Sequence, residues 1–330
     1  EKEVWLSALK NSSMVSGEIH SPLVLDTGNK LYLARYFDFQ QRLIVNIVSR
    51  LKSNVAPIGM GLANHNQLAN QIDQMLETYF PDKSEHYMPQ KLAVRNAVEK
   101  PFTIISGGPG TGKTFVIQLI RQILTEHAQK TGAPVPRILC LAPTGKAASK
   151  MENGRTIHSA LKPLKEGQKF YHNKQNPLHY DIIFIDEASM IDLPLFVRLL
   201  EAIPDTAKVI LTGDAHQLSA IQAGAVFSDL CKIDALASHR FELEYNFRSQ
   251  GKTGIEQLSR AIKDSRIESI EKIFLSDQYP DVQFKALDQT ASLKDILTET
   301  IPAGYNPLLR AESVEQALAN ADSFRVLCAH

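Results

Sequence analysis

Residues 107–114 read Gly-Gly-Pro-Gly-Thr-Gly-Lys-Thr, and this stretch decides the fold of the chain. It fits the phosphate-loop pattern G-x-x-x-x-G-K-[ST] without a mismatch. An apolar run at residues 102–105 precedes it, and an amphipathic run at residues 115–128 follows it. The motif therefore lies between a predicted buried strand and a predicted helix. Because a phosphate loop needs that context, the sequence favours a nucleotide-binding α/β domain over a glycine-rich turn that binds nothing.

The predicted loop offers backbone and side-chain groups to a triphosphate. Its glycines allow positive φ and close approach of the backbone, so that freed N–H groups can cradle phosphate oxygens. Lys113 would reach the β- and γ-phosphates, and the Thr114 hydroxyl would bind Mg²⁺. We therefore expect ATP and Mg²⁺ as cofactors. The expected nucleotide contacts from the loop are Gly107, Gly108, Pro109, Gly110, Thr111, Gly112, Lys113 and Thr114.

Two carboxylates follow a second predicted strand, at residues 181–185. Asp186 and Glu187 would lie at its carboxyl end, where ligands bind in open α/β sheets. Asp186 would hold Mg²⁺ together with Thr114, and Glu187 would polarise the attacking water as general base. A solvated acidic turn would look the same in isolation. The phosphate loop upstream is what favours the catalytic interpretation.

Three further positions carry weaker signals. Gln217 follows a predicted strand at residues 208–212, and its amide could contact both the γ-phosphate and the nucleophilic water. Arg248 could offset negative charge in the transition state. Gln90, one helix upstream of the loop, is placed to hydrogen-bond the adenine edge. Taken alone, each could equally be a residue without such a role, and for Arg248 a surface position is the simpler interpretation.

Candidate DNA contacts follow the predicted strand at residues 137–142. A short helix begins there, and its exposed N–H groups suit a nucleic-acid phosphate as well as a nucleotide. A second short segment, Thr156-Ile-His, comes after a glycine-containing turn. Its histidine, taken alone, would more often be a capped or core residue. The expected DNA contacts are Thr144, Gly145, Lys146, Thr156 and His158.

Strand–helix alternation from about residue 89 predicts a parallel sheet with helices on both faces. We expect strands at 102–106, 137–142, 181–185, 208–212 and 324–329, and helices at 89–99, 113–128, 145–151, 192–202, 223–231 and 253–263. Before them, the pattern predicts two short strands around a turn at 26–29 and helices at 37–51 and 66–79. These elements suggest domains at 1–85, 86–250 and 251–330.

Composition narrows the class of protein. The 330 residues contain 36 Lys and Arg against 36 Asp and Glu, so any contact with DNA must be local. No apolar run approaches the ~20 residues that span a membrane. Cys140, Cys231 and Cys328 form neither a zinc spacing nor a disulfide framework, which favours the reducing cytoplasm. Because the chain begins without Met, we expect a fragment.

Taken in order, these segments resemble the superfamily 1 DNA helicases. The similar segments are Gln90-x-x-Ala93 (the Q motif), residues 107–114 (motif I), 144–146 (motif Ia), 156–158 (the segment after it), 186–189 (motif II), 213–218 (motif III) and 246–248 (motif IV). Ala142-Pro-Thr-Gly-Lys-Ala-Ala and Pro22-Leu-Val-Leu-Asp are similar to the RecD family, the α subunits of exodeoxyribonuclease V.

This resemblance implies the fold of a RecA-like P-loop NTPase, preceded by a small, mostly helical α+β docking domain. It implies an ATP-dependent helicase that moves 5′→3′ on single-stranded or tailed duplex DNA. RecB- and RecC-like subunits would be its partners in double-strand break repair and recombination. The family also has a second RecA-like domain, of which the chain would hold only the start.

Two other interpretations stay open. The chain could be a stand-alone RecD-like helicase, or another P-loop ATPase with a mainly structural role in an assembly. The segment Gly213-Asp-Ala-His-Gln-Leu is not typical of other P-loop motors. Intact Lys113, Asp186 and Glu187 argue against a vestigial ATP site.

Overall fold

The computed structural model describes residues 2–53, 65–80, 84–165, 169–217, 224–247, 253–276, 278–284, 293–321 and 323–327. The chain divides into two compact units, Glu1–Gly251 and Lys252–His330. The larger unit contains the phosphate loop and every strand of the described residues.

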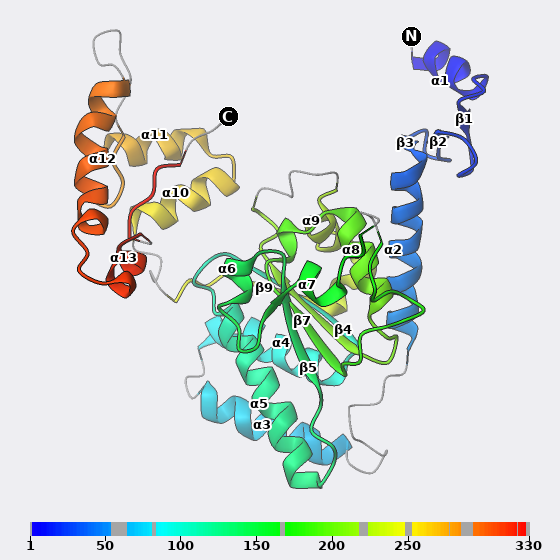
Figure 1. Cartoon of the computed structure of the whole chain (residues 1–330), viewed down its shortest axis with the longest axis horizontal. Coiled ribbons are helices and arrows are strands. Elements are labelled where there is room, and N and C mark those ends of the chain that lie inside the picture. Colours follow the sequence, from blue (N-terminus) through cyan, green and yellow to red (C-terminus); the bar gives the residue numbers. More distant parts are fainter. Residues whose placement is uncertain are drawn as a thin grey trace. The chain divides into compact units, whose positions relative to one another are not determined.

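A six-stranded sheet forms the centre of the larger unit (Figure 1). Its order is β6-β5-β7-β8-β4-β9, and every neighbouring pair is parallel. The strands are β4 (Phe102–Gly107), β5 (Ile138–Ala142), β6 (Arg155–Thr156), β7 (Ile182–Ile185), β8 (Lys208–Gly213) and β9 (Arg240–Leu243). The predicted α/β fold is confirmed, as are four of the predicted strands. The short edge strands β6 and β9 were not predicted.

Helices cover both faces of this sheet, as the apolar strands require. One layer consists of α2 (Ala34–Lys52), α7 (Ile157–Leu161), α8 (Leu193–Ala202) and α9 (Val226–Leu230). The other consists of α3 (His65–Tyr79), α4 (Met88–Glu99), α5 (Lys113–Thr131) and α6 (Gly145–Ala148). Successive strand residues alternate between the layers: Ile104 packs in the first core and Ile105 in the second. Short 3-10 helices lie at Glu85–Tyr87, Ala188–Met190 and Asp234–His239.

The predicted helix at 145–151 is confined to α6. The chain turns back towards β6 so closely that a Cβ at Gly154 would clash with the carbonyl oxygen of Ala148. Cys140 is a buried thiol in β5, as predicted, whereas Cys328 lies outside the described residues.

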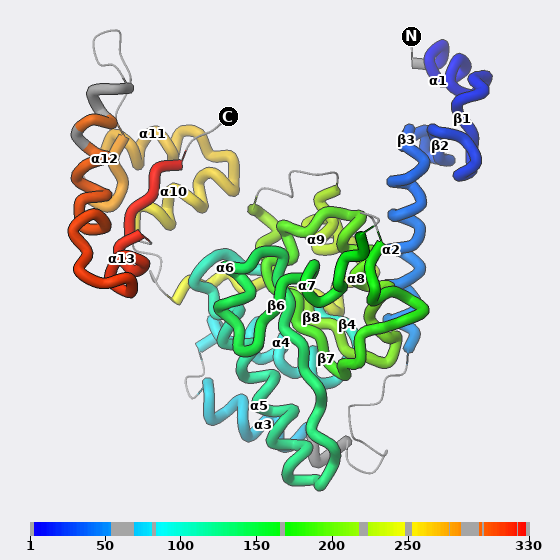
Figure 2. Tube along the Cα trace, in the orientation of Figure 1, coloured from blue at the N-terminus to red at the C-terminus, as the bar shows by residue number. Residues whose placement is uncertain are grey.

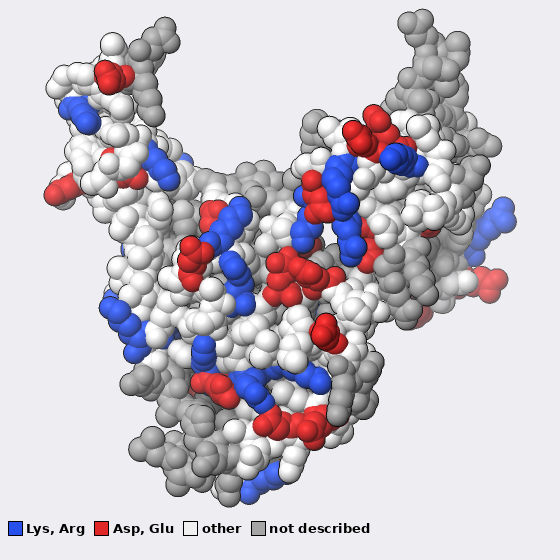
Figure 3. All heavy atoms as spheres, turned by 180° about the vertical axis from the view of Figure 1, so that it is seen from behind, with Lys and Arg blue, Asp and Glu red and all other residues white. Residues whose placement is uncertain are grey.

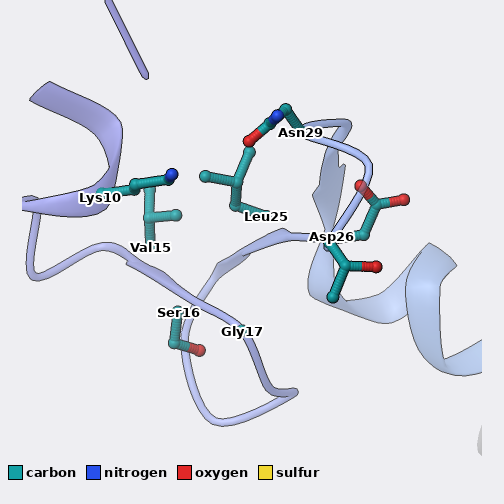
Figure 4. A pocket seen from close by; sticks show the side chains of 8 residues that line it. Lys10, Val15, Ser16, Gly17, Leu25, Asp26 and Asn29 are labelled. Atoms are coloured by element: carbon teal, nitrogen blue, oxygen red, sulfur yellow. The ribbon is translucent and has the colours of Figure 1, made fainter. Parts of the chain in front are cut away.

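The N-terminal segment folds as α1 (Lys2–Lys10), β1 (Val15–Ser16), β2 (Leu23–Leu25) and β3 (Leu31–Leu33). β2 and β3 are antiparallel, as predicted. Their turn is closed by Asp26, whose carboxylate accepts from the backbone N–H of Lys30 at 2.8 Å, and Asn29 has a φ of 59°. A pocket of about 240 Å³ lies between α1 and this turn, lined in part by Lys10 and Leu25 (Figure 4).

Helix α2 is anchored on α8, and the two run beside each other (Figure 2). The Arg50 side chain is fully buried and donates to the carbonyl oxygens of Leu200, Ile203 and Pro204, at 2.5–2.9 Å. Arg42 adds a bidentate contact with Glu201, at 2.6 and 2.8 Å. Burial lowers the pKa of Arg50 to about 10. These contacts satisfy carbonyl groups that the end of α8 leaves without intrahelical partners.

The smaller unit contains α10 (Gly254–Lys263), α11 (Ile267–Leu275), α12 (Leu293–Leu309) and α13 (Val314–Ala321). The predicted strand at 324–329 is wrong over its described part, because residues 324–327 have no regular structure. A strand needs a neighbour to satisfy its N–H and C=O groups, and the described residues of this unit contain no other strand. Residues 328 and 329 lie outside the described residues.

Candidate nucleotide-binding site

The motifs meet at one edge of the sheet because all six strands are parallel. Residues 108–114 follow β4, Thr144 follows β5, Asp186 follows β7 and Asp214 follows β8. Carboxyl ends of neighbouring parallel strands share an edge, which is where open α/β sheets bind ligands. The fold therefore brings the phosphate loop, Thr144 and the carboxylates of Asp186 and Asp214 to a common region.

The phosphate loop has a conformation that requires glycine. Gly110 and Gly112 have φ values of 81° and 90°, where side chains are disfavoured. A Cβ on Gly112 would lie 2.5 Å from Gln90 Nε2, and one on Gly107 would lie 2.6 Å from Thr111 Oγ1. That threonine hydroxyl donates to the carbonyl oxygen of Gly108 at 2.8 Å. Gln90 thus packs tightly against the loop, and the Thr111 hydroxyl stabilises it from within.

Lys113 begins α5 and folds back over the loop. Its ammonium donates to the carbonyl oxygens of Gly107 and Gly108, the latter at 2.9 Å. Burial lowers the pKa of Lys113, while the carboxylates of Asp214, Asp186 and Glu187 oppose that shift. The site thus holds a partly desolvated ammonium against carbonyl oxygens. An incoming phosphate would offer this ammonium a stronger, charged hydrogen-bond partner.

The two carboxylates after β7 are held differently. Asp186 Oδ1 accepts a hydrogen bond of 2.6 Å from the hydroxyl of Thr212 on β8. Glu187 has left-handed backbone, with a φ of 53°, a conformation that is costly for a residue with a Cβ. Asp214 is buried, and its Oδ1 accepts from the backbone N–H of His216 at 3.0 Å. Strained backbone of this kind often occurs at functional sites.

Gln90 lies beneath the phosphate loop. Its side chain is buried, and Nε2 donates to the carbonyl oxygen of Thr111 at 2.8 Å. Within the described residues its Oε1 is buried without a hydrogen-bond partner. The amide therefore supports the left-handed turn of the loop, a role that the sequence reasoning missed. Its contact with adenine stays a prediction.

Residues after β9 also brace the loop. Asn246 Nδ2 donates to the carbonyl oxygen of Pro109 at 3.2 Å, and the Phe247 N–H donates to that of Gly110 at 3.0 Å. The Phe247 ring stacks on Tyr87, with centroids 5.2 Å apart, and Tyr245 stacks on His86 at 4.2 Å. Sequence reasoning did not find this bracing role. The two aromatic residues in Tyr245-Asn-Phe247 are the sequence feature that could have indicated this packing.

Two further candidates, Gln217 and Thr114, are exposed. Gln217 lies in the turn after β8, and its N–H donates to the carbonyl oxygen of Asp214 at 3.3 Å. Thr114 lies in the first turn of α5. Arg248 lies outside the described residues. Their roles remain predictions.

The candidate DNA contacts lie at the starts of α6 and α7, which follow the neighbouring strands β5 and β6. Thr144 Oγ1 and Thr156 Oγ1 each cap their helix by accepting a backbone N–H, at 3.2 Å in both cases. Gly145, Lys146 and His158 are exposed. On the face seen in Figure 3, Lys and Arg lie among Asp and Glu and form no continuous basic area. Any DNA contact on that face would therefore be local.

Within the described ranges, no group of three or more His, Cys, Asp or Glu side chains could hold a metal ion. The described helices also include none that is long and apolar enough to cross a bilayer.

A family model described as "AAA domain" matches residues 90–223. The "RecBCD enzyme subunit RecD" of Mycobacterium tuberculosis (strain CDC 1551 / Oshkosh) is 30% identical over 358 residues, which cover 99% of this chain and 57% of that protein. The "ATP-dependent RecD2 DNA helicase" of Deinococcus radiodurans is 35% identical over 162 residues, which cover 48% of this chain and 21% of that protein.

A solved structure, the Pif1 helicase from Bacteroides in complex with ADP-AlF3 and ssDNA, is 20% identical with a TM-score of 0.41. The match covers 70% of this chain and 58% of that one. The chain spans 57–59% of the length of the first curated relatives. The α/β fold and the order of the motifs agree with this similarity, which extends along almost the whole chain to the RecD subunits.

Proposed function

We propose that this chain is the ATP-hydrolysing part of a DNA helicase subunit in a RecBCD-type exodeoxyribonuclease V. The observation that carries the proposal is the position of Lys113. Its ammonium lies on the carbonyl oxygens of a glycine-rich loop, under the influence of three carboxylates at the same sheet edge. A structural turn would gain nothing from a desolvated cation, whereas a triphosphate site requires one.

Thr114 and Asp186 fit the needs of Mg²⁺. This ion prefers oxygen ligands and usually takes one or two protein carboxylates, with phosphates and water completing its shell. Asp186 is half-buried, and Thr212 occupies only one of its oxygens in the described structure. When bound, Mg²⁺ would neutralise charge on the β- and γ-phosphates.

We propose the following roles in the hydrolytic step. Glu187 would accept a proton from the attacking water, and Gln217 would contact the γ-phosphate and that water. Arg248 would offset charge on the transferred group. The backbone N–H groups of residues 107–114 would hold the phosphates in place, with Gln90 near the adenine.

DNA would cross the starts of α6 and α7. The side chains and N–H groups of Thr144, Gly145, Lys146, Thr156 and His158 would contact phosphates without reading sequence. We propose residues 1–85 as a docking domain for RecB- or RecC-like subunits and residues 86–250 as the first motor domain. Residues 251–330 would lead into the second. The protein would move 5′→3′ on DNA, and it would act in the repair of double-strand breaks.

The test uses the full-length protein that contains this chain, with and without its co-purified subunits. ATP hydrolysis is measured with and without single-stranded DNA, and unwinding is measured on 5′- and 3′-tailed duplexes. We expect DNA to stimulate hydrolysis, only the 5′-tailed duplex to be unwound, and Lys113→Gln to abolish both. Hydrolysis that DNA leaves unchanged would contradict the helicase proposal.

A second candidate is a stand-alone helicase, because similarity to the RecD2 helicase covers about half of this chain, 48%. Co-purification separates the two. A protein that unwinds 5′-tailed duplexes at full rate without partner subunits would support the stand-alone candidate. A protein that assembles with partners and contributes no hydrolysis would instead support a structural role.

A further inference from the structure

A basic pocket of about 370 Å³ lies beside the edge strand β6. Five of its lining residues are basic, namely Arg137, Arg155, Lys162, His172 and His179. None of them belongs to the phosphate loop or to the carboxylate turn after β7. The volume falls within the range of small-molecule sites. A concentration of basic side chains around one hollow is unexpected in a chain whose total formal charge is zero.

The three permanent cations come from separate elements. Arg137 precedes β5, Arg155 begins β6, and Lys162 directly follows α7. Arg137 is paired with Asp181, at 2.9 Å, and its hydrogen bonds hold the pKa of that carboxyl below its usual value. In the described part of the chain, neither Arg155 nor Lys162 forms an ion pair. The excess positive charge of the pocket therefore comes from these two residues.

The other lining residues suit the flat ring of a nucleic-acid base. Leu139 and Leu178 are buried, and Tyr180 is half-buried. The His172 ring is fixed because its Nδ1 donates to the carbonyl oxygen of Asn176 at 3.2 Å. Proteins that bind single-stranded nucleic acids combine rings with cationic side chains. The bases stack on the rings, and the phosphates contact the cations.

The pocket adjoins the candidate DNA contacts along the chain. Arg155 directly precedes Thr156 on β6, and the single short helix α7 connects Thr156 to Lys162. A strand of DNA that reached the start of α7 could therefore continue around the edge of the sheet. This continuity favours a nucleic acid over an acidic peptide, which would have no reason to lie next to Thr156 and His158.

We propose that this pocket binds one nucleotide of single-stranded DNA, with the phosphate on Arg155 and Lys162 and the base against Tyr180. This inference rests on the proposed function, because it takes DNA to be the polymer that the protein handles. It adds a lateral contact, outside the edge that carries the ATP site. Such a contact would hold DNA independently of the nucleotide state of the motor.

The experiment compares two double variants of the full-length protein that remove equal charge. Arg155→Ala/Lys162→Ala removes the two pocket cations. Lys130→Ala/Lys232→Ala removes two exposed lysines elsewhere on the same unit. Binding of fluorescein-labelled oligothymidylate is followed by anisotropy, without ATP, over a salt series. Circular dichroism and binding of a fluorescent ATP analogue check that both variants fold.

We expect the pocket variant to lose affinity by on the order of tenfold and the magnitude of the slope of log K against log[salt] to fall by about 0.7, the contribution of one single-strand phosphate contact. The control variant should keep the wild-type slope. Equal losses in both variants would overturn the proposal. The proposal would also be overturned if the pocket variant kept its DNA affinity and lost only the binding of free thymidine monophosphate.

Photo-crosslinking with 5-iododeoxyuridine locates the base directly. We expect adducts on Tyr180, His172 or His179 in the wild-type protein and their loss in the pocket variant. Adducts found only at residues 144–146, 156 and 158 would contradict the proposal. Failure of the helicase proposal would be seen separately, as DNA binding and pocket adducts without DNA-stimulated hydrolysis.

Discussion

The hydroxyl of Thr212 donates a hydrogen bond of 2.6 Å to Oδ1 of Asp186, across the neighbouring strands β8 and β7. Thr212 is fully buried, so the bond is shielded from water. It fixes the orientation of the carboxylate that we assign to Mg²⁺. Partners of metal ligands often matter almost as much as the ligands themselves.

Replacing Thr212 by Val should weaken the apparent affinity for Mg²⁺ in ATP hydrolysis. Valine keeps the shape of the side chain and removes the donor, so the carboxylate can turn. We expect the Mg²⁺ concentration for half-maximal rate to rise by about 10-fold or more, the range for such partners. The measurement is ATP hydrolysis during a Mg²⁺ titration.

The matched control is Thr103→Val, since Thr103 is equally buried and donates to Asn96 Oδ1, at 2.9 Å, away from the acidic turn. Both variants should lose a similar, small amount of stability, about 1 kcal/mol. A Thr103 variant with the same Mg²⁺ shift would show that the effect is general destabilisation.

Replacing Glu187 by Gly should stabilise the protein, because glycine adopts the observed φ of 53° without steric cost. The gain should be about 1 kcal/mol in the free energy of unfolding. Urea denaturation measures it. Glu187→Ala is the control, because it removes the carboxylate and keeps the Cβ. If alanine stabilised the protein as much as glycine, charge rather than backbone strain would be the cause.

Lys208 should make stability depend on pH. Its side chain is fully buried, its ammonium donates to the carbonyl oxygen of Lys100 at 2.9 Å, and burial lowers its pKa from 10.5 to about 7. Between these two values the unfolded chain binds more protons than the folded one, so the free energy of unfolding should rise with pH. Below about pH 7 Lys208 is protonated in both the folded and the unfolded chain, so it adds no pH dependence there.

The measurement is urea denaturation of the wild-type protein and of Lys208→Met at about pH 7 and pH 9.5, a window set by linkage between protonation and folding. The free energy of unfolding of the wild type should rise relative to that of Lys208→Met at higher pH. Lys232→Met, at an exposed site, should follow the wild type. A Lys208→Met protein with the wild-type pH slope would rule out Lys208 as the source.

Replacing Arg50 by Met should loosen α2 from α8. The change leaves three carbonyl oxygens without their donor, at a cost of about 1–3 kcal/mol for each buried group left unsatisfied. Hydrogen exchange of residues 34–52 should accelerate, while exchange in β4 stays slow. Arg35→Met, an exposed position on the same helix, is the control. Unchanged exchange in the Arg50 variant would contradict the anchoring role.

The predictable parts of the structure were those with local signals. Continuous apolar runs predicted β4, β5, β7 and β8, because strands buried on both faces must be apolar throughout. The edge strand β9, Arg240–Leu243, escaped because two of its four residues are charged. The strand predicted at 324–329 failed for the opposite reason: its sequence is apolar, but the described residues around it offer no partner strand.

Contacts between distant residues could not be read from the sequence. Arg50 meets the end of α8 about 150 positions later, and no local pattern marks either end. The basic pocket likewise gathers residues from 137 to 180, a stretch of sequence that includes two helices and two strands. Gln90 was found by its motif, yet its hydrogen bond to the Thr111 carbonyl depends on how α4 packs beneath the loop.

The central claim is that the edge containing Lys113 and Glu187 binds and hydrolyses a nucleoside triphosphate. Its most direct test is Glu187→Gln in the full-length protein, with nucleotide affinity and single-turnover hydrolysis measured on the same sample. We expect unchanged ATP binding and a chemical step slowed by about 10²–10⁴-fold, the range for loss of a general base. A variant that hydrolyses ATP at the wild-type rate, or that no longer binds it, would contradict the claim.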